Sequence, residues 1–223
     1  MNERAVPKTP YGGGPAAEVG SEQVLTAEED LRTVTIGELR PLNGQIELLP
    51  YQPDWPALYA REEGRIRSAL GGTVARLEHV GSTSVPGLSA KPIIDILLVV
   101  PDSSDEPAYV PDLEASGYVL RIREPNWFEH RMFRGPDTSV NLHVFSPGAA
   151  EIDRMLAFRD RLRTDEADRH LYELAKLDLA RRDWKYVQQL RRREDGGRDG
   201  DPGAGARVRR GPAIGSEEAE PPT

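Results

Sequence analysis

An almost continuous apolar segment, residues 93–100, constrains the fold more than any other part of this 223-residue chain. Seven of its eight residues are apolar, which predicts a strand that is covered on both faces of a sheet. The exception is Asp95. A carboxylate inside a buried strand needs a partner, a hydrogen-bond network or a metal ion. The segment therefore predicts a sheet together with a polar site on it.

A turn rich in glycine and hydroxyl groups, Gly81-Ser82-Thr83-Ser84, comes shortly before this strand. Glycine lets the backbone turn without a Cβ clash, and hydroxyl and backbone N–H groups at such a turn suit an anion such as phosphate. Lys91 adds a positive charge nearby. Two interpretations stay open. The turn either binds phosphate beside the acid, or it simply joins two strands while Asp95 caps a neighbouring loop.

The composition excludes several classes of protein. The formal net charge is −8, so we expect no general binding to nucleic acids or anionic lipid. The chain has no cysteine, which excludes disulfides and thiolate chemistry. Its apolar segments are too short to span a bilayer, and its first residues lack the apolar core of a signal peptide. We therefore expect a cytoplasmic protein with no membrane contact. The oligomeric state stays open.

Hydrophobic periodicity predicts an α+β protein, because strands and helices alternate first and helices follow. The expected strands are residues 46–49, 74–80, 93–100, 118–123, 130–134 and 140–145, with the last two forming a hairpin. The expected helices are residues 27–32, 55–70, 107–116, 149–163 and 166–182. Composition divides the chain into a linker-like, disordered segment 1–42 with one short helix, a folded domain 43–190 and a disordered tail 191–223.

Strand alternation places the polar residues of this sheet on faces. Asp95 shares a face with Leu97, and His143 shares one with Asn141. If the two strands are neighbours, Asp95 and His143 lie together near the glycine turn, and His79 and Lys91 flank them.

The residues around the turn resemble a known family. His79-Val80-Gly81-Ser82-Thr83-Ser84-Val85-Pro86-Gly87-Leu88, followed by Lys91-Pro92-Ile93-Ile94-Asp95-Ile96, is similar to the motif of the GrpB-like family of the nucleotidyltransferase superfamily. The similarity continues through Asn141-Leu142-His143-Val144 and into the last helices, and it covers about residues 46–188.

The resemblance implies a polymerase-beta-like nucleotidyltransferase fold: a small mixed sheet with packed helices and a C-terminal helical part. It implies that the Gly-Ser turn opens a helix that touches nucleotide phosphates. In the active pattern, two carboxylates one residue apart and a third on a later strand hold Mg²⁺. Asp95 matches the first, but Leu97 takes the second position and His143 the third. Either one metal ion binds Asp95 with His143, or the metal is lost.

The candidate residues follow from the residues and the resemblance together. The catalytic candidates are Asp95 and His143, with Asp95 also the candidate ligand of Mg²⁺; the phosphate-binding candidates are Gly81, Ser82, Thr83, Ser84 and Lys91; and further cleft candidates are His79, Arg131, Tyr172 and Lys176. Each also has a structural interpretation. The histidines fit a core, Arg131 fits a surface salt bridge, and Tyr172 with Lys176 fits a solvated helix face.

Two functions of different classes remain. The first is binding of a nucleotide such as ATP, or another phosphate-bearing small molecule, with nucleotidyl transfer to an unknown acceptor. The second is a non-catalytic accessory module, as in relatives joined to dephospho-CoA kinase. The missing second carboxylate favours the module, and the intact glycine turn favours binding.

The tail departs from the family after residues 186–188. Residues 189–200 can be encoded by GC-rich codons. When the reading frame of those codons is moved by one base, they can encode a sequence like that of the family. We hypothesise a frameshift; the alternative is a naturally divergent, disordered tail. The gene sequence distinguishes the two.

Overall fold

The computed structural model describes residues 27–38 and 47–181 of the chain. The predictions for most of the N-terminal segment, for the family similarity after residue 181 and for the tail lie outside these residues. The frameshift hypothesis also concerns residues outside them. In the described part, no helix is long and apolar enough to cross a membrane.

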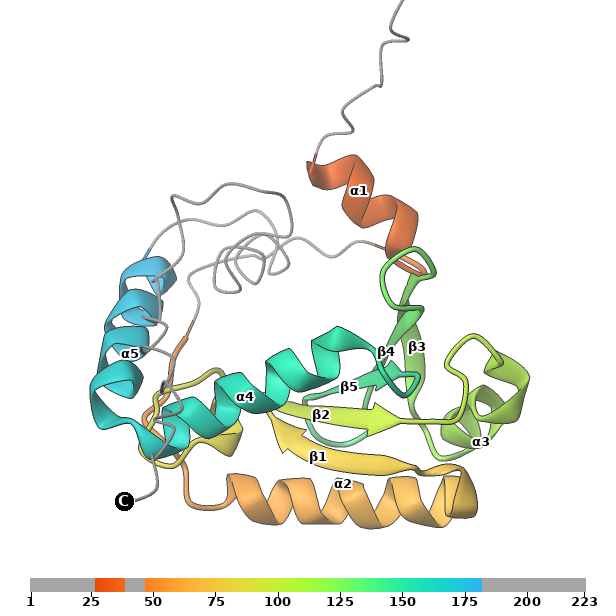
Figure 1. Ribbon diagram of the computed structural model, residues 1–223, viewed down its shortest axis with the longest axis horizontal. Coiled ribbons are helices and arrows are strands. Elements are labelled where there is room, and N and C mark those ends of the chain that lie inside the picture. The colour runs from red at the N-terminus through yellow and green to blue at the C-terminus, as the bar shows by residue number, and fades with distance from the viewer. Residues whose placement is uncertain (1–26, 39–46, 182–223) are drawn as a thin grey trace, which may run out of the picture.

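The described residues form one mixed sheet in the strand order β1-β2-β5-β4-β3 (Figure 1). The strands are β1 (Arg76–Val80), β2 (Ile94–Val99), β3 (Val119–Glu124), β4 (His130–Arg134) and β5 (Val140–Phe145). β2 pairs antiparallel with β1 and parallel with β5, while β4 pairs antiparallel with both β5 and β3. The predicted α+β class and the predicted hairpin are therefore confirmed.

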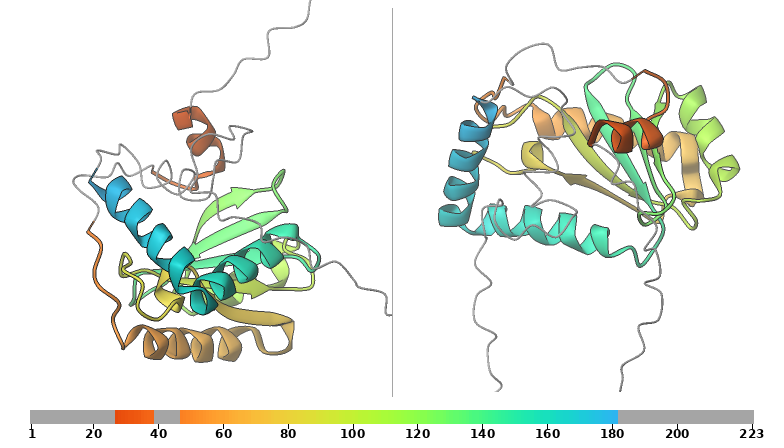
Figure 2. Two further views of the ribbon diagram at one scale, coloured as in Figure 1. Left: turned by 60° about the vertical axis from the view of Figure 1, so that its left-hand side comes forward. Right: turned by 90° about the horizontal axis from the view of Figure 1, so that it is seen from above.

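The two faces of β2 pack against different helices, as its apolar sequence predicts. Ile94, Ile96 and Leu98 belong to a core cluster that contains residues of α2 (Trp55–Leu70) and α3 (Val110–Ala115). Leu97 and Val99 pack in a second cluster with α4 (Ala150–Thr164). The sheet lies between α2 and α4 in the view from above (Figure 2). β2 is thus buried on both sides.

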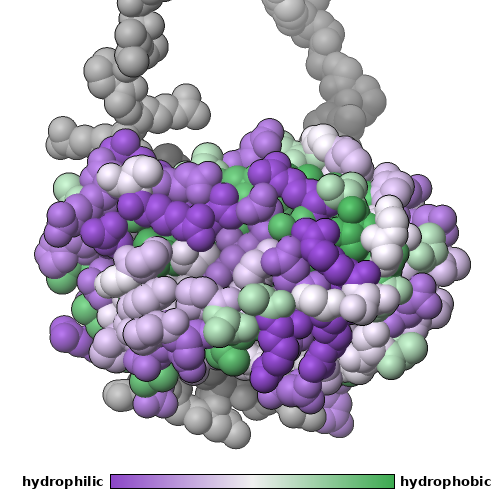
Figure 3. All heavy atoms as spheres, turned by 90° about the horizontal axis from the view of Figure 1, so that it is seen from below, coloured by the Kyte–Doolittle hydropathy of each residue, from purple (hydrophilic) through white to green (hydrophobic). Residues whose placement is uncertain are grey.

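The remaining helices lie around the sheet. α5 (Glu166–Ala180) and α3 lie at opposite ends of the sheet (Figures 1 and 2). α1 (Ala27–Val34) leads into Thr35, which bridges to Ile122 of β3. Part of the segment expected to be linker-like therefore contacts the sheet. Viewed from the side of α2, the surface is mainly hydrophilic, with small scattered apolar patches (Figure 3).

Three local predictions were wrong. The strand expected at residues 46–49 is a single bridge between Leu49 and Ala90. The helix expected at 107–116 is a 3₁₀ turn (Glu106–Ala108) followed by the short α3. The Gly-Ser turn does not open a helix. It forms one 3₁₀ turn (Ser82–Ser84), because the backbone is extended again at Val85. No helix dipole is therefore available at that turn.

Candidate functional site

Gly81 ends β1 and lies directly against Asp95 of β2. Asp95 pairs with Val80 across the two strands, so the chain at Gly81 passes beside its carboxyl group. Gly81 has φ +68° and ψ −173°, a conformation that is essentially restricted to glycine. A Cβ there would lie 2.6 Å from Oδ2 of Asp95. The 81–84 loop and the strand aspartate therefore converge.

Asp95 meets two side chains of the neighbouring parallel strand. Asn141 is its partner in the register, and the Nδ2 group of Asn141 donates to Oδ1 of Asp95. His143 lies two residues further along β5, with Nε2 at 3.8 Å from the same carboxylate oxygen. The side chains of Asp95 and His143 keep 21% and 16% of their surface exposed. The pair is therefore reachable from solvent.

A hydrogen-bonded chain continues from His143 toward the sheet edge. Nδ1 of His143 is 3.0 Å from Nε2 of His130, and Nδ1 of His130 is 2.7 Å from Oε2 of Glu124. The two imidazoles stack at 5.2 Å, and His130 also stacks on Phe145. Asp95, His143, His130 and Glu124 therefore form a continuous row, which we call the acid–histidine chain.

The Glu124 carboxylate determines which ring nitrogens donate hydrogen bonds in the acid–histidine chain. A carboxylate only accepts hydrogen bonds, so Nδ1 of His130 donates to Glu124. With neutral rings, Nε2 of His130 then accepts from Nδ1–H of His143. Nε2 of His143 is left with a lone pair that faces Asp95. This atom lies 3.8 Å from Oδ1 of Asp95, a position that suits acid–base work.

Two of the three loop hydroxyls serve the loop itself. Oγ1 of Thr83 donates to the carbonyl of Ile93 and lies 3.1 Å from Nε2 of His79. Oγ of Ser84 donates to the carbonyl of Gly81. Both hydroxyl groups therefore bond within the turn, and phosphate binding at Thr83 and Ser84 stays a prediction.

Ser82 is the loop hydroxyl that meets a cation. Lys176 of α5 donates from Nζ to Oγ of Ser82 at 2.7 Å and to the carbonyl of Ser89 at 3.3 Å. Its Nζ lies 5.5 Å from the centre of the Tyr172 ring. Lys91 is half-buried in the segment before β2. Lys176 and Tyr172 thus lie beside the loop, although they belong to α5, which is distant from it in the sequence.

His79 lies on the other face of the sheet from Asp95. It stacks on Tyr59 of α2 with ring centroids 4.8 Å apart. Burial is the main cause that lowers the pKa of His79 from 6.5 to about 4, against the opposing effect of Asp95. His79 is therefore neutral at pH 7 and does not join the acid–histidine chain.

Arg131 forms a salt bridge, as its structural interpretation predicted, but with Glu106 in a buried position. Its Nε donates to Oε1 of Glu106 at 2.5 Å, and its Nη1 donates to the carbonyl of Glu129. Neighbouring residues of a strand point to opposite faces. His130 enters the acid–histidine chain, so Arg131 lies on the far side of β4.

Sequence reasoning missed Asn141, His130 and Glu124 as site residues. Asn141 had a usable signal, because it shares a face of its strand with His143 and pairs with Asp95 in a parallel register. His130 required the order of the strands, since only the β4–β5 pairing places it beside His143. Glu124 required the short connection between β3 and β4.

The donor set does not fit a resident Mg²⁺ ion. Mg²⁺ prefers several oxygen ligands, whereas Asp95 supplies one carboxylate here, beside the imidazole of His143 and the amide of Asn141 that donates to it. Leu97 is buried in the apolar cluster against α4, so β2 itself supplies no second carboxylate beside Asp95. Among the described residues, no group of three or more His, Cys, Asp or Glu side chains is arranged to hold a metal ion. The Mg²⁺ site expected at Asp95 is therefore not supported.

Comparison with known proteins places this α+β fold and loop in a family. The family model described as "GrpB protein" matches residues 45–194. The chain belongs to the GrpB family.

Three relatives illustrate the range of the similarity. A UPF0157 protein of Halalkalibacterium halodurans is 60% identical over 174 residues, covering 78% of this chain and 89% of that protein. The crystal structure of GrpB from Enterococcus faecalis has a TM-score of 0.55 and 32% identity, covering 60% of this chain and 82% of that one. A dephospho-CoA kinase of Mycolicibacterium paratuberculosis is 33% identical over 106 residues, which cover 46% of this chain and 25% of that enzyme.

Proposed function

We propose that this protein binds the phosphates of a nucleotide at the 81–84 loop and transfers a nucleotidyl group to a hydroxyl acceptor. One observation carries the proposal: the Lys176 ammonium group lies 2.7 Å from the Ser82 hydroxyl, on the loop whose Gly81 abuts Asp95. A cation, a hydroxyl and an acid–base pair thus meet at one loop.

Lys176 supplies the attraction for the anion. It is buried, and a charge interacts more strongly with an anion where water is excluded. Ser82 can accept from Lys176 and still donate its own proton to a phosphate oxygen. Tyr172 holds the ammonium group over its ring. Lys91, near the start of β2, adds a second cation.

The acid–histidine chain supplies the proton transfer. Nε2 of His143 takes the proton of the acceptor hydroxyl, and the oxygen attacks the α-phosphorus of a nucleoside triphosphate. The bond to the bridging oxygen breaks and pyrophosphate leaves. Asp95 stabilises the imidazolium ion, and His130 with Glu124 fixes the orientation of the ring. Mg²⁺ has no resident site in this scheme and enters, as in ATP–Mg²⁺, with the nucleotide.

Calorimetry with ATP, in the presence and absence of Mg²⁺, tests the binding step. We expect Lys176→Met to weaken ATP binding at least tenfold. Arg67→Gln is the matched control, since Arg67 is an exposed cation of α2 paired with Glu63. Equal affinities of the two variants, or no heat from any nucleotide with the parent protein, would contradict the proposal.

The accessory-module function is the second candidate, favoured by Leu97 at the place of a carboxylate. His143→Gln separates the two functions. For a transferase, the variant binds ATP like the parent but releases no pyrophosphate in the presence of hydroxyl acceptors. For a module, the parent itself releases none under the same conditions.

A further inference from the structure

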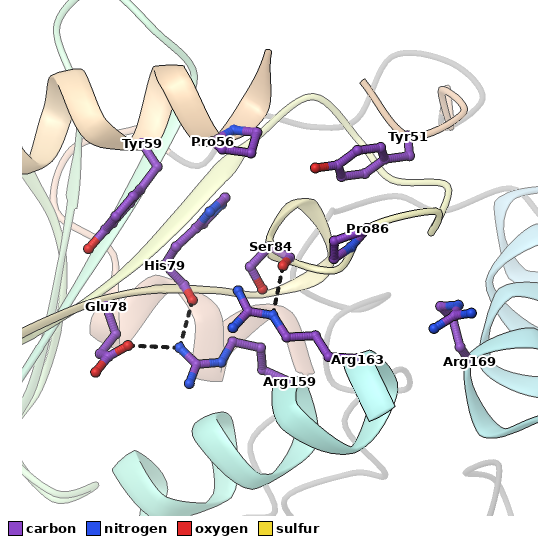
Figure 4. A pocket seen from close by; sticks show the side chains of 10 residues that line it. All are labelled: Tyr51, Pro56, Tyr59, Glu78, His79, Ser84, Pro86, Arg159, Arg163 and Arg169. Atoms are coloured by element: carbon purple, nitrogen blue, oxygen red, sulfur yellow. Dashed lines mark hydrogen bonds and ion pairs between the residues drawn. The ribbon is translucent and has the colours of Figure 1, made fainter. Parts of the chain in front are cut away.

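A cleft lies at the outer edge of β1, away from Asp95. Its volume is about 670 Å³, within the usual range for small-molecule sites. Its lining comes from α2, β1, the 81–84 loop, α4 and α5, together with Tyr51 before α2 and Pro86 after the loop, and no residue of β2 or β5 takes part (Figure 4). Because β1 pairs only with β2 in the sheet, the cleft and the acid–histidine chain lie on opposite sides of β1.

The cleft carries a positive charge. Three of its lining residues are arginines, Arg159 and Arg163 of α4 and Arg169 of α5, against one carboxylate, Glu78. His79 is neutral at pH 7, so the lining has a formal charge of about +2. Arg159 already has partners within the protein, because its Nη1 donates to Glu78 and to the carbonyl of His79. The remaining charge belongs to Arg163 and Arg169.

Arg163 and Arg169 keep donor capacity for a ligand. One nitrogen of each guanidinium group donates to a backbone carbonyl: Nε of Arg163 to that of Ser84, and Nη1 of Arg169 to that of Leu162. Nη1 of Arg163 also forms a long ion pair with Oδ1 of Asp160, at 3.9 Å. A guanidinium group has five donors. Burial is the main cause that lowers the pKa of Arg163, followed by the nearby charge of Arg159.

The opposite wall of the cleft is aromatic. The rings of Tyr59 and His79 stack in parallel at 4.8 Å, with 4° between their planes. Figure 4 shows them across the cleft from the arginines, with Tyr51 beside Pro86. A site with two guanidinium groups on one side and flat rings on the other suits a ligand that is anionic at one end and planar at the other.

We propose that this cleft binds a phosphate monoester whose organic part carries an aromatic ring. Arg163 and Arg169 hold the phosphate, and the side of Tyr59 and His79 holds the ring. The proposal stands apart from nucleotidyl transfer at Asp95, since it uses other residues on the other side of β1.

Phenyl phosphate is the probe that combines both features, and inorganic phosphate is the probe that lacks the ring. Binding of each to the full chain is measured by calorimetry. We expect phenyl phosphate to bind tighter than phosphate, and Arg163→Gln to weaken phenyl phosphate at least tenfold. Arg169→Gln is a second variant on another helix. Arg161→Gln is the control, because Arg161 is on α4 like Arg163 but pairs with Asp165 and Asp168.

The outcomes are decisive in both directions. The proposal fails if phenyl phosphate does not bind at millimolar concentration, or if Arg163→Gln and Arg169→Gln both bind it as tightly as Arg161→Gln. It also fails if Lys176→Met, rather than the arginine variants, abolishes binding, since the phosphate then occupies the 81–84 loop. Thermal unfolding of every variant confirms that a loss of binding is not a loss of folding.

Discussion

The backbone of Gly81 and the carboxylate of Asp95 occupy adjoining space, so that a single added methyl group at Gly81 would lie 2.6 Å from Oδ2 and 2.9 Å from Cβ of Asp95. This contact ties the loop to the strand that follows it. The position of the acid therefore depends on the absence of a side chain in the loop, and a test of that dependence is available.

Gly81→Ala should destabilise the protein by more than about 2 kcal/mol, because both the contact with Asp95 and the backbone conformation oppose a side chain. Gly87→Ala is the matched control. Gly87 also has a positive φ, +79°, but an added Cβ would meet nothing within 4 Å. We expect about 1 kcal/mol for Gly87→Ala from the backbone alone. Urea unfolding measures both changes, and equal losses would show that Asp95 does not constrain Gly81.

The burial of His79 predicts a dependence of stability on pH. The folded-state pKa of about 4 is below the unfolded value of 6.5, so the unfolded chain binds more protons between these values. Stability from this residue is complete above pH 6.5 and falls as the pH drops toward 4, by about 3 kcal/mol.

Urea unfolding at several pH values checks this effect. In His79→Gln the decline between pH 6.5 and 4 should be smaller than in the parent protein, because the titrating group is gone. A parallel decline in the two proteins would assign the effect to other residues.

A buried tyrosine–carboxylate bond makes a third prediction. Oη of Tyr118 donates to Oε2 of Glu62 at 2.6 Å, and Glu62 is fully buried. Tyr118→Phe should cost about 2 kcal/mol or more, because the carboxylate loses a donor. Tyr109→Phe removes a bond of similar length, 2.7 Å, to the neutral carbonyl of Ser103, and about 1 kcal/mol is expected. Denaturant unfolding compares them, and a larger loss at Tyr109 would contradict the argument from charge.

The sheet and the convergence at Asp95 were predictable because they rest on local patterns. Two-residue alternation placed Asp95 and His143 on strand faces, and the apolar run of β2 specified burial on both sides. The glycine turn identified the loop. These signals lie within single strands or between neighbouring segments, where sequence spacing fixes geometry.

The rest of the site depends on contacts between distant segments. The pairing of β4 with β5 brings His130 to His143, and no local pattern specifies that order of strands. The hydroxyl groups of Thr83 and Ser84 bond within the loop because the 3₁₀ turn is tight. Arg159 and Arg163 reach the 670 Å³ cleft because α4 ends beside β1, which spacing alone does not reveal.

The apolar periodicity of α5 overstated its burial, and this difference gives the last prediction. Leu171, Leu174 and Leu177 recur at helical spacing, a pattern typical of a buried helix face, yet Leu174 keeps 51% of its surface exposed, whereas Leu162 at the end of α4 keeps 1%. Truncation of a buried leucine creates a cavity, while truncation of an exposed one does not.

Leu162→Ala should therefore cost about 2 to 5 kcal/mol, and Leu174→Ala less than about 0.5 kcal/mol, as measured by urea unfolding of the two variants. A loss above 2 kcal/mol for Leu174→Ala would mean that this face of α5 is covered in solution, and dependence of that loss on protein concentration would identify a second copy of the chain as the cover.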